Sequence, residues 1–156
     1  MFPMKMLIVM RWLHDLATVV WLGGMFTLGI VLLPSARQAL GPGPHLRKLM
    51  EGFQKRLSTL VYISMVILII TGLPLARNNP HFQGLFSFDN TYSTTLTIKH
   101  VLVLAMMALG LTRSLVLVRR GQPDRDREKL KMGILYLNMG LGVVVLLLSS
   151  MSAYLS

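Results

Sequence analysis

Residues 11–34 read RWLHDLATVVWLGGMFTLGIVLLP and decide the class of fold. The apolar run from Trp12 to Leu33 has the length of a helix that crosses a hydrocarbon core, roughly 20 residues. His14 and Asp15 stand just inside one end of this run. Ionisable groups in a membrane span are costly, and they mark functional sites by default. We expect a membrane-spanning helix that stops at Pro34, because proline has no N–H to donate inside a helix.

Three further apolar runs follow this stretch in a chain of which 53% is hydrophobic. The fold predicted from them is all-α: an integral membrane four-helix bundle with up-down-up-down topology, in a single domain that covers residues 1–156. The predicted spans are 8–33, 57–76, 96–118 and 133–155. Residues 45–56 are expected to form a short interfacial helix, and Pro74 is expected to kink or end the second span. The chain has no cysteine, which excludes disulfides and thiolate metal sites.

The basic residues predict the topology. The segment 34–56 contains five Lys and Arg residues, the segment 119–131 contains six with Arg113 close by, and the segment 77–95 contains one. Because positive residues remain cytoplasmic, the segments 34–56 and 119–131 are expected inside and both termini outside, in the inner (plasma) membrane of the cell. Lys5 and Arg11 conflict with this orientation in a minor way. The net charge of +10 is therefore attributed to topology, and no nucleic-acid partner is expected.

Two polar pairs occupy matched positions. His14–Asp15 lies near the start of the first span, and Lys99–His100 lies near the start of the third. The two spans are predicted to run in the same direction, and the depths of the two histidines agree within about one turn. In an up-down-up-down bundle these helices are diagonal neighbours, and the wider gap between diagonal helices suits a porphyrin.

The first functional hypothesis is a b-type haem near the outer face, with His14 and His100 as ligands of the iron and a role in redox chemistry or electron transfer. If the protein is an enzyme, it is expected to be an oxidoreductase. Asp15 would orient a ligand or pair with Lys99. Lys99 would meet a haem propionate or replace His100 as the ligand. Gly23 and Gly24 would allow close approach of either a neighbouring helix or a flat cofactor.

Copper is the second hypothesis. Met10 and His14 share a helix face, as do His100 and Met107, and thioether plus imidazole suits Cu(I). Most of the twelve methionines are nevertheless expected to fill the interior.

Two simpler hypotheses need no cofactor. The histidines would then only hydrogen-bond between helices, or the chain would be an accessory subunit of a larger membrane complex. Expected partners are the lipid bilayer, a redox partner or larger complex, and a second copy of the chain. Arg113 is expected to extend to the membrane interface.

His14, Trp21, Gly23-Gly24 and Pro34 together resemble the first helix of the copper-resistance protein D (CopD) superfamily, whose relatives include the HemJ-type protoporphyrinogen oxidases. The second and third helices are similar in MEGFQKRL (50–57), in Thr71-Gly72 and in Ile98-Lys99. The resemblance covers about the first 118 residues. It implies a four-helix membrane fold, and either copper handling or haem binding with porphyrin oxidation.

In the HemJ-type relatives a first-helix histidine and a third-helix lysine form the important pair, and His14 and Lys99 match these positions. Trp21 and Gly24 are carried over as cofactor-binding positions. The chain departs from the pattern in two places: His100 directly follows the lysine, and the arginine after Pro34 comes only at Arg37.

Overall fold

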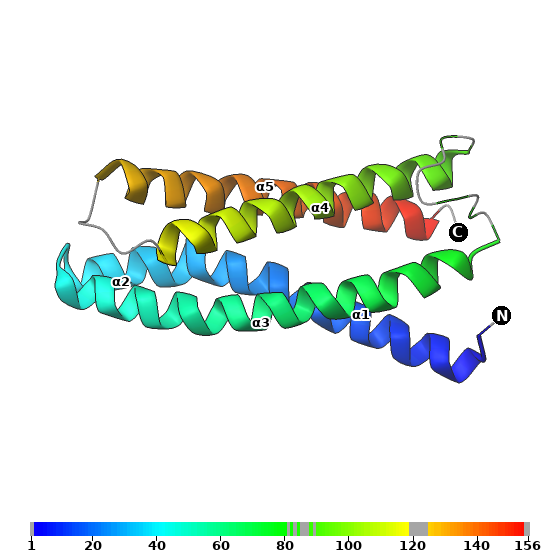
Figure 1. Cartoon of the computed structure of the whole chain (residues 1–156), viewed down its shortest axis with the longest axis horizontal. Helices are drawn as coiled ribbons and strands as arrows, with labels where there is room; N and C mark the ends of the chain where they lie inside the picture. Colours follow the sequence, from blue (N-terminus) through cyan, green and yellow to red (C-terminus); the bar gives the residue numbers. More distant parts are fainter. Residues whose placement is uncertain are drawn as a thin grey trace. The chain divides into compact units, whose positions relative to one another are not determined.

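The computed structural model describes residues 2–80, 82, 84, 88, 90–118 and 125–154. The elements in chain order are α1 (Met4–Phe26), the π-helix η1 (Thr27–Leu32), α2 (Leu33–Leu40), α3 (Pro44–Arg77), α4 (Thr91–Val118) and α5 (Arg125–Tyr154) (Figure 1). Four helical segments are long and apolar enough to cross a membrane: Met4–Leu40, Pro44–Arg77, Thr91–Ser114 and Asp126–Tyr154. The predicted all-α class and the four spans are confirmed. The side of the membrane on which each terminus lies stays a prediction.

One compact unit, Pro3–Gly72, pairs α1 with the antiparallel α3. His14 contacts Thr71, and Gly24 lies beside Leu57. A Cβ atom at Gly24 would overlap the side chain of Leu57, so glycine lets the two helices approach closely here. The buried side chains of α1 and η1 repeat every three to four residues and therefore form one face of the helix: Ala17, Trp21, Leu22, Met25 and Leu28.

The first span does not end at Pro34, contrary to the prediction. The helix continues to Leu40 because the backbone widens into η1 before the proline. The N–H of Leu33 bonds the carbonyl of Leu28, five residues back, as in a π-helix. Proline has no N–H to fill the next position, and it is tolerated as the second residue of α2. The helix ends at Gly41, whose φ of +64° is a conformation suited to glycine.

The second span is also longer than predicted. The expected interfacial helix 45–56 and the expected span 57–76 form the single helix α3, which begins at Pro44. Pro74 lies inside this helix and does not end it. Pro74 cannot donate a hydrogen bond to the carbonyl of Ile70, but its own carbonyl still accepts from the N–H of Asn78, and three more residues of α3 follow it.

The other compact unit comprises Leu73–Ser156 with residues 1–2, and its main feature is the antiparallel pair of α4 and α5. Asn90 caps α4 because its Oδ1 accepts a hydrogen bond from the N–H of Ser93. This cap explains why α4 begins five residues before the predicted span. On α5 the amide Nδ2 of Asn138 donates to the carbonyl of Met106 on α4 at 3.2 Å. That bond ties the two helices together within the apolar layer.

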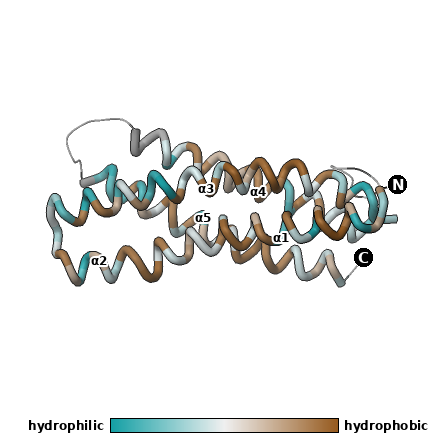
Figure 2. Tube along the Cα trace, turned by 90° about the horizontal axis from the view of Figure 1, so that it is seen from below, coloured by the Kyte–Doolittle hydropathy of each residue, from teal (hydrophilic) through white to brown (hydrophobic). Residues whose placement is uncertain are grey.

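Large apolar side chains cover the outside of the helices, as a lipid environment requires. Figure 2 shows hydrophobic residues along most of the spans, with hydrophilic residues gathered toward helix ends. Along α5 the exposed apolar residues alternate with a buried face. Leu135 is 1% exposed, whereas Leu137, two residues later, is 55% exposed. The same residue type therefore serves the interior and the lipid on one helix.

These two leucines provide a matched test of helix packing. Leu135→Ala is expected to lower the free energy of unfolding in detergent micelles by about 2 kcal/mol or more, because it leaves a cavity in a packed layer. Leu137→Ala is expected to change the same quantity by less than about 0.5 kcal/mol, because the side chain faces lipid. Equal effects of the two substitutions would contradict the assignment of the inner face of α5.

Candidate functional site

His14 lies on the buried face of α1 and is held by a hydroxyl of α3. Its Nδ1 is 2.9 Å from Oγ1 of Thr71. The same hydroxyl donates its only proton to the carbonyl of Ile67, at 2.7 Å. Oγ1 must therefore accept in the bond with the imidazole, so Nδ1 of His14 carries a proton. The lone pair of the neutral ring then lies on Nε2, the nitrogen able to ligate a metal.

Gly72 gives the imidazole its place against α3. A Cβ atom added at Gly72 would lie 3.3 Å from Cε1 of His14 and 3.7 Å from its Nδ1. The first distance is tighter than an ordinary contact, so a side chain here would push the ring by a few tenths of an ångström. Thr71 is 4% exposed, which protects its hydrogen bond from competing solvent. Thr71 and Gly72 together fix the orientation of His14.

His100 carries the same pattern of hydrogen bonding within α4. Its Nδ1 lies 2.7 Å from the backbone carbonyl of Leu96, one turn earlier. A carbonyl oxygen only accepts hydrogen bonds, so Nδ1 of His100 is the donor and its lone pair lies on Nε2. Histidines that bind metals commonly donate the other ring N–H in this way, which fixes the tautomer and raises the basicity of the ligating nitrogen. His14 and His100 therefore present the same ligand atom. Whether they face each other stays a prediction.

Asp15 has an ion-pair partner on its own helix, and its predicted roles toward a ligand or Lys99 stay predictions. Its carboxylate pairs with Arg11 at 3.5 Å, one turn earlier on α1, and the side chains of Arg11 and Asp15 are 65% and 63% exposed. An ion pair this exposed contributes little to stability. It does offset the charge of Asp15 on the side of α1 away from the buried face. Lys99 is half-buried on α4, next to His100.

The remaining predicted site residues lie on α1 and α4. Trp21 is 3% exposed and belongs to the buried face of α1. Gly24 serves the contact with Leu57 of α3. Met10 is half-buried one turn before His14, and Met107 is buried two turns after His100. Within the described part of the chain, no three His, Cys, Asp or Glu side chains form a group able to hold a metal ion. A copper site would therefore need thioether ligands.

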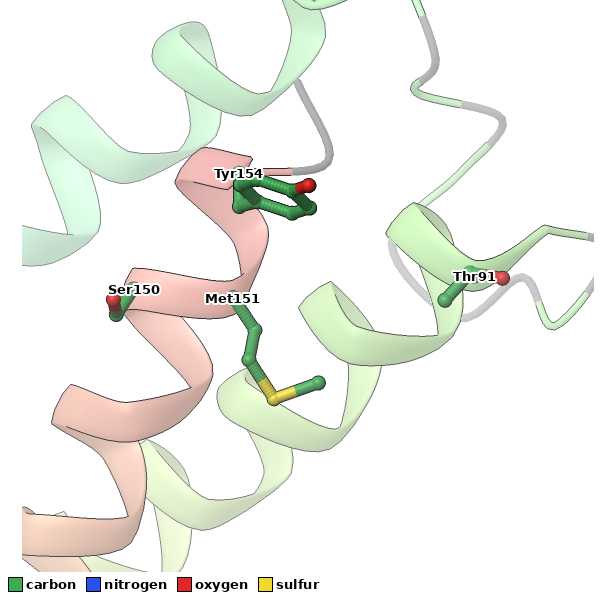
Figure 3. A pocket seen from close by; sticks show the side chains of 4 residues that line it. All are labelled: Thr91, Ser150, Met151 and Tyr154. Atoms are coloured by element: carbon green, nitrogen blue, oxygen red, sulfur yellow. The ribbon is translucent and has the colours of Figure 1, made fainter.

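A depression lies between the start of α4 and the end of α5 (Figure 3). It is lined by Thr91, Ser150, Met151 and Tyr154. The lining holds one thioether and three hydroxyl groups but no histidine or carboxylate, so it does not extend either histidine site.

Thr71 and Gly72 were predicted only as part of the family resemblance, and neither was predicted to contact His14. A usable signal was present, because a polar Thr beside Gly interrupts the apolar run 57–76. A buried polar side chain in a span needs a partner, and a glycine beside it marks close approach. The pairing of α3 with α1 was required to connect this signal to His14.

Most of the chain matches a family of known proteins. A family model described as copper resistance protein D matches residues 51–152, about two thirds of the chain. The matched range includes Thr71, Gly72, Lys99 and His100 and extends through most of α5, whereas His14 precedes it. The predicted resemblance covered the first three spans. The matched range instead begins in α3 and includes most of the fourth span. No curated protein and no solved structure matches the chain.

The tautomer of His14 is directly measurable. In protein labelled with ¹⁵N-histidine, we expect the NMR shifts of His14 to report a protonated Nδ1 and an unprotonated Nε2. Thr71→Val removes the acceptor while nearly keeping the shape of the side chain, so it should abolish this tautomer preference. Thr59→Val is the matched control, because Thr59 is exposed on the same helix and bonds only the carbonyl of Lys55. A protonated Nε2 in the unaltered protein would contradict the geometry.

Proposed function

The chain belongs to the copper resistance protein D family, and from that premise we propose that it is a multi-pass membrane protein that binds one b-type haem through Nε2 of His14 and Nε2 of His100. The proposed role is electron transfer. The observation that carries the proposal is the common tautomer of the two histidines, each with Nδ1–H held by an oxygen acceptor.

The two imidazoles alone match the ligand requirement of a haem. A b-type haem needs at most two protein ligands because the porphyrin supplies the other four nitrogens, and histidine is a frequent axial ligand. A zinc ion held only by protein side chains needs three or four ligands. The described residues have no such group among His, Cys, Asp and Glu. Two imidazoles on two apolar helices match the smaller requirement.

The chain's own residues would tune such a site. Thr71 and the carbonyl of Leu96 hold the two imidazole rings by their N–H groups and make Nε2 more electron-rich. Gly72 leaves room for the ring of His14. Lys99 is proposed to place its ammonium near a propionate, one residue from the ligand. The haem itself would supply the reversible one-electron chemistry of its iron.

An absorption spectrum of the purified protein tests the proposal. We expect a Soret band, either as isolated or after addition of haemin, and a low-spin spectrum on reduction. His14→Ala and His100→Ala should each abolish the low-spin spectrum, since each removes one ligand. His45→Ala is the matched control, because His45 is exposed at the start of α3. Thr71→Val should weaken haem binding by about tenfold. Absence of a Soret band under all these conditions would refute the haem assignment.

Copper is the second candidate, favoured by the description of the matched family and by the Met10–His14 and His100–Met107 pairs. In this case copper is the protein's substrate or cargo. Elemental analysis of protein purified from copper-supplemented cells should then find copper. Met10→Leu and Met107→Leu should lower it, whereas Met4→Leu should not, because Met4 is 78% exposed near the start of α1. Copper content unchanged by either thioether substitution would contradict this candidate.

The two measurements also distinguish an accessory role. A protein with neither a Soret band nor copper that co-purifies with other membrane chains would be a subunit of a larger complex.

A further inference from the structure

Arg113 is a buried cation that the proposed haem site does not use. It lies on α4, thirteen residues after His100, which corresponds to about 20 Å along the helix axis. The sequence led us to expect that its guanidinium reaches the membrane interface. In the structure its Nε and Nη2 atoms are buried, and neither has a hydrogen-bond partner among the residues that the structure describes. A buried charge without a partner is strongly unfavourable.

The two unpartnered nitrogens have a specific geometry. Nε–H and the outer N–H of Nη2 point in the same direction from one edge of the planar guanidinium. This edge is the fork that binds two oxygens of a single carboxylate or phosphate group. The unsatisfied atoms are thus a matched pair of donors, and the ligand that suits them is an oxyanion.

The register of the α4–α5 pair brings a second cation, Lys131, to the level of Arg113 along the helix axes. Asn138 bonds the carbonyl of Met106, and at the other end of the pair Thr91 of α4 and Tyr154 of α5 line the same depression, which fits an antiparallel alignment (Figure 3). Arg113 lies seven residues after Met106, and Lys131 lies seven residues before Asn138. Seven residues are close to two full turns, so both side chains leave the facing sides of their helices at one level.

Lys131 is itself poorly exposed and its charge is already compensated. Its side chain is 17% exposed, and its Nζ lies 2.9 Å from Oε1 of Glu128. The carboxylate of Glu128 is held one turn earlier on the same helix and is 53% exposed. Arg113, Lys131 and Glu128 together carry a net charge of +1. One anionic group would neutralise the cluster.

We propose that Arg113, together with Lys131, binds the phosphate group of an anionic phospholipid at the C-terminal end of α4 and the N-terminal end of α5. The level of Arg113 near the end of the apolar stretch Thr91–Ser114 matches the depth of a lipid headgroup. Basic pockets between membrane helices on the side with the most Lys and Arg are typical sites for acidic lipids. A propionate of a haem ligated by His100 is excluded as the occupant by the axial separation of about 20 Å.

Solvent does not reach Nε or Nη2 of Arg113, so a phosphate bound to them would be shielded from water. Binding is therefore expected to be slow to reverse and to persist through purification. This site does not depend on the proposed haem, because it uses other residues at another level of α4.

Lipid retention in matched variants tests the site. Protein purified in detergent is exposed to phosphatidylglycerol or to phosphatidylcholine, and the bound lipid is measured by native mass spectrometry. The unaltered protein should retain phosphatidylglycerol selectively. Arg113→Gln should weaken this retention by about tenfold or more, because it removes a charged hydrogen-bond donor pair. Arg113→Lys should restore it only in part, because lysine has no fork. Arg127→Gln is the control, since it removes an exposed charge from the same basic segment.

A second experiment, thermal unfolding with lipid or with inorganic phosphate, identifies the source of the bound phosphate group. The thermal midpoint should rise with phosphatidylglycerol in the unaltered protein and not in Arg113→Gln. Inorganic phosphate should not reproduce this rise; if it does so at millimolar concentration and depends on Arg113, the lipid assignment is overturned in favour of a soluble phosphate compound. Equal retention by Arg113→Gln and the unaltered protein would overturn the site. If Arg113→Gln loses its helical circular dichroism, Arg113→Lys, which keeps the charge, decides the result.

Discussion

The hydroxyl of Thr71 donates a hydrogen bond to the carbonyl of Ile67, and the proposed role of His14 depends on this bond. Because the hydroxyl proton goes to the carbonyl of Ile67, the oxygen can only accept a hydrogen bond from His14. A span in lipid offers few competing acceptors, so this arrangement is maintained by the absence of water as much as by the bond itself. The consequence is an imidazole with a defined ligand atom. His100 reaches the same state with a backbone carbonyl and needs no second helix.

The architecture supports this interaction by close approach of α1 and α3. Gly24 leaves room for the side chain of Leu57, and Gly72 leaves room for the ring of His14, so each helix has a glycine opposite a side chain of the other. Two prolines lie within the helical segments that form this pair, and neither stops its helix. Pro34 is preceded by a π-helical turn, and Pro74 lies in the last turn of α3, which continues past it to Arg77. The backbone thus absorbs both prolines without breaking the surface that holds His14.

The features that depend on the composition and length of the apolar runs were predictable from the sequence. The four spans follow from apolar runs, and His14 and His100 stood out as ionisable residues in them. The limits of the helices were less predictable, because the start of α4 depends on the cap at Asn90 and the passage through Pro34 depends on a π-helix. The role of Thr71 was missed because it arises from contact with a residue, His14, that lies 57 positions earlier in the chain. The ion pair of Asp15 with Arg11 follows the i, i+4 spacing of one helical turn, whereas the predicted role of Asp15 in the site stays a prediction.

The central claim is that Nε2 of both histidines binds one redox-active group. Electron–nuclear double resonance on oxidised protein containing ¹⁵N-histidine tests it most directly, because the method detects only nitrogens bound to the paramagnetic centre. We predict couplings from two histidine nitrogens, reduced to one in either single variant, His14→Ala or His100→Ala. A paramagnetic centre without histidine coupling, or a pair of couplings unchanged by both substitutions, would contradict the claim.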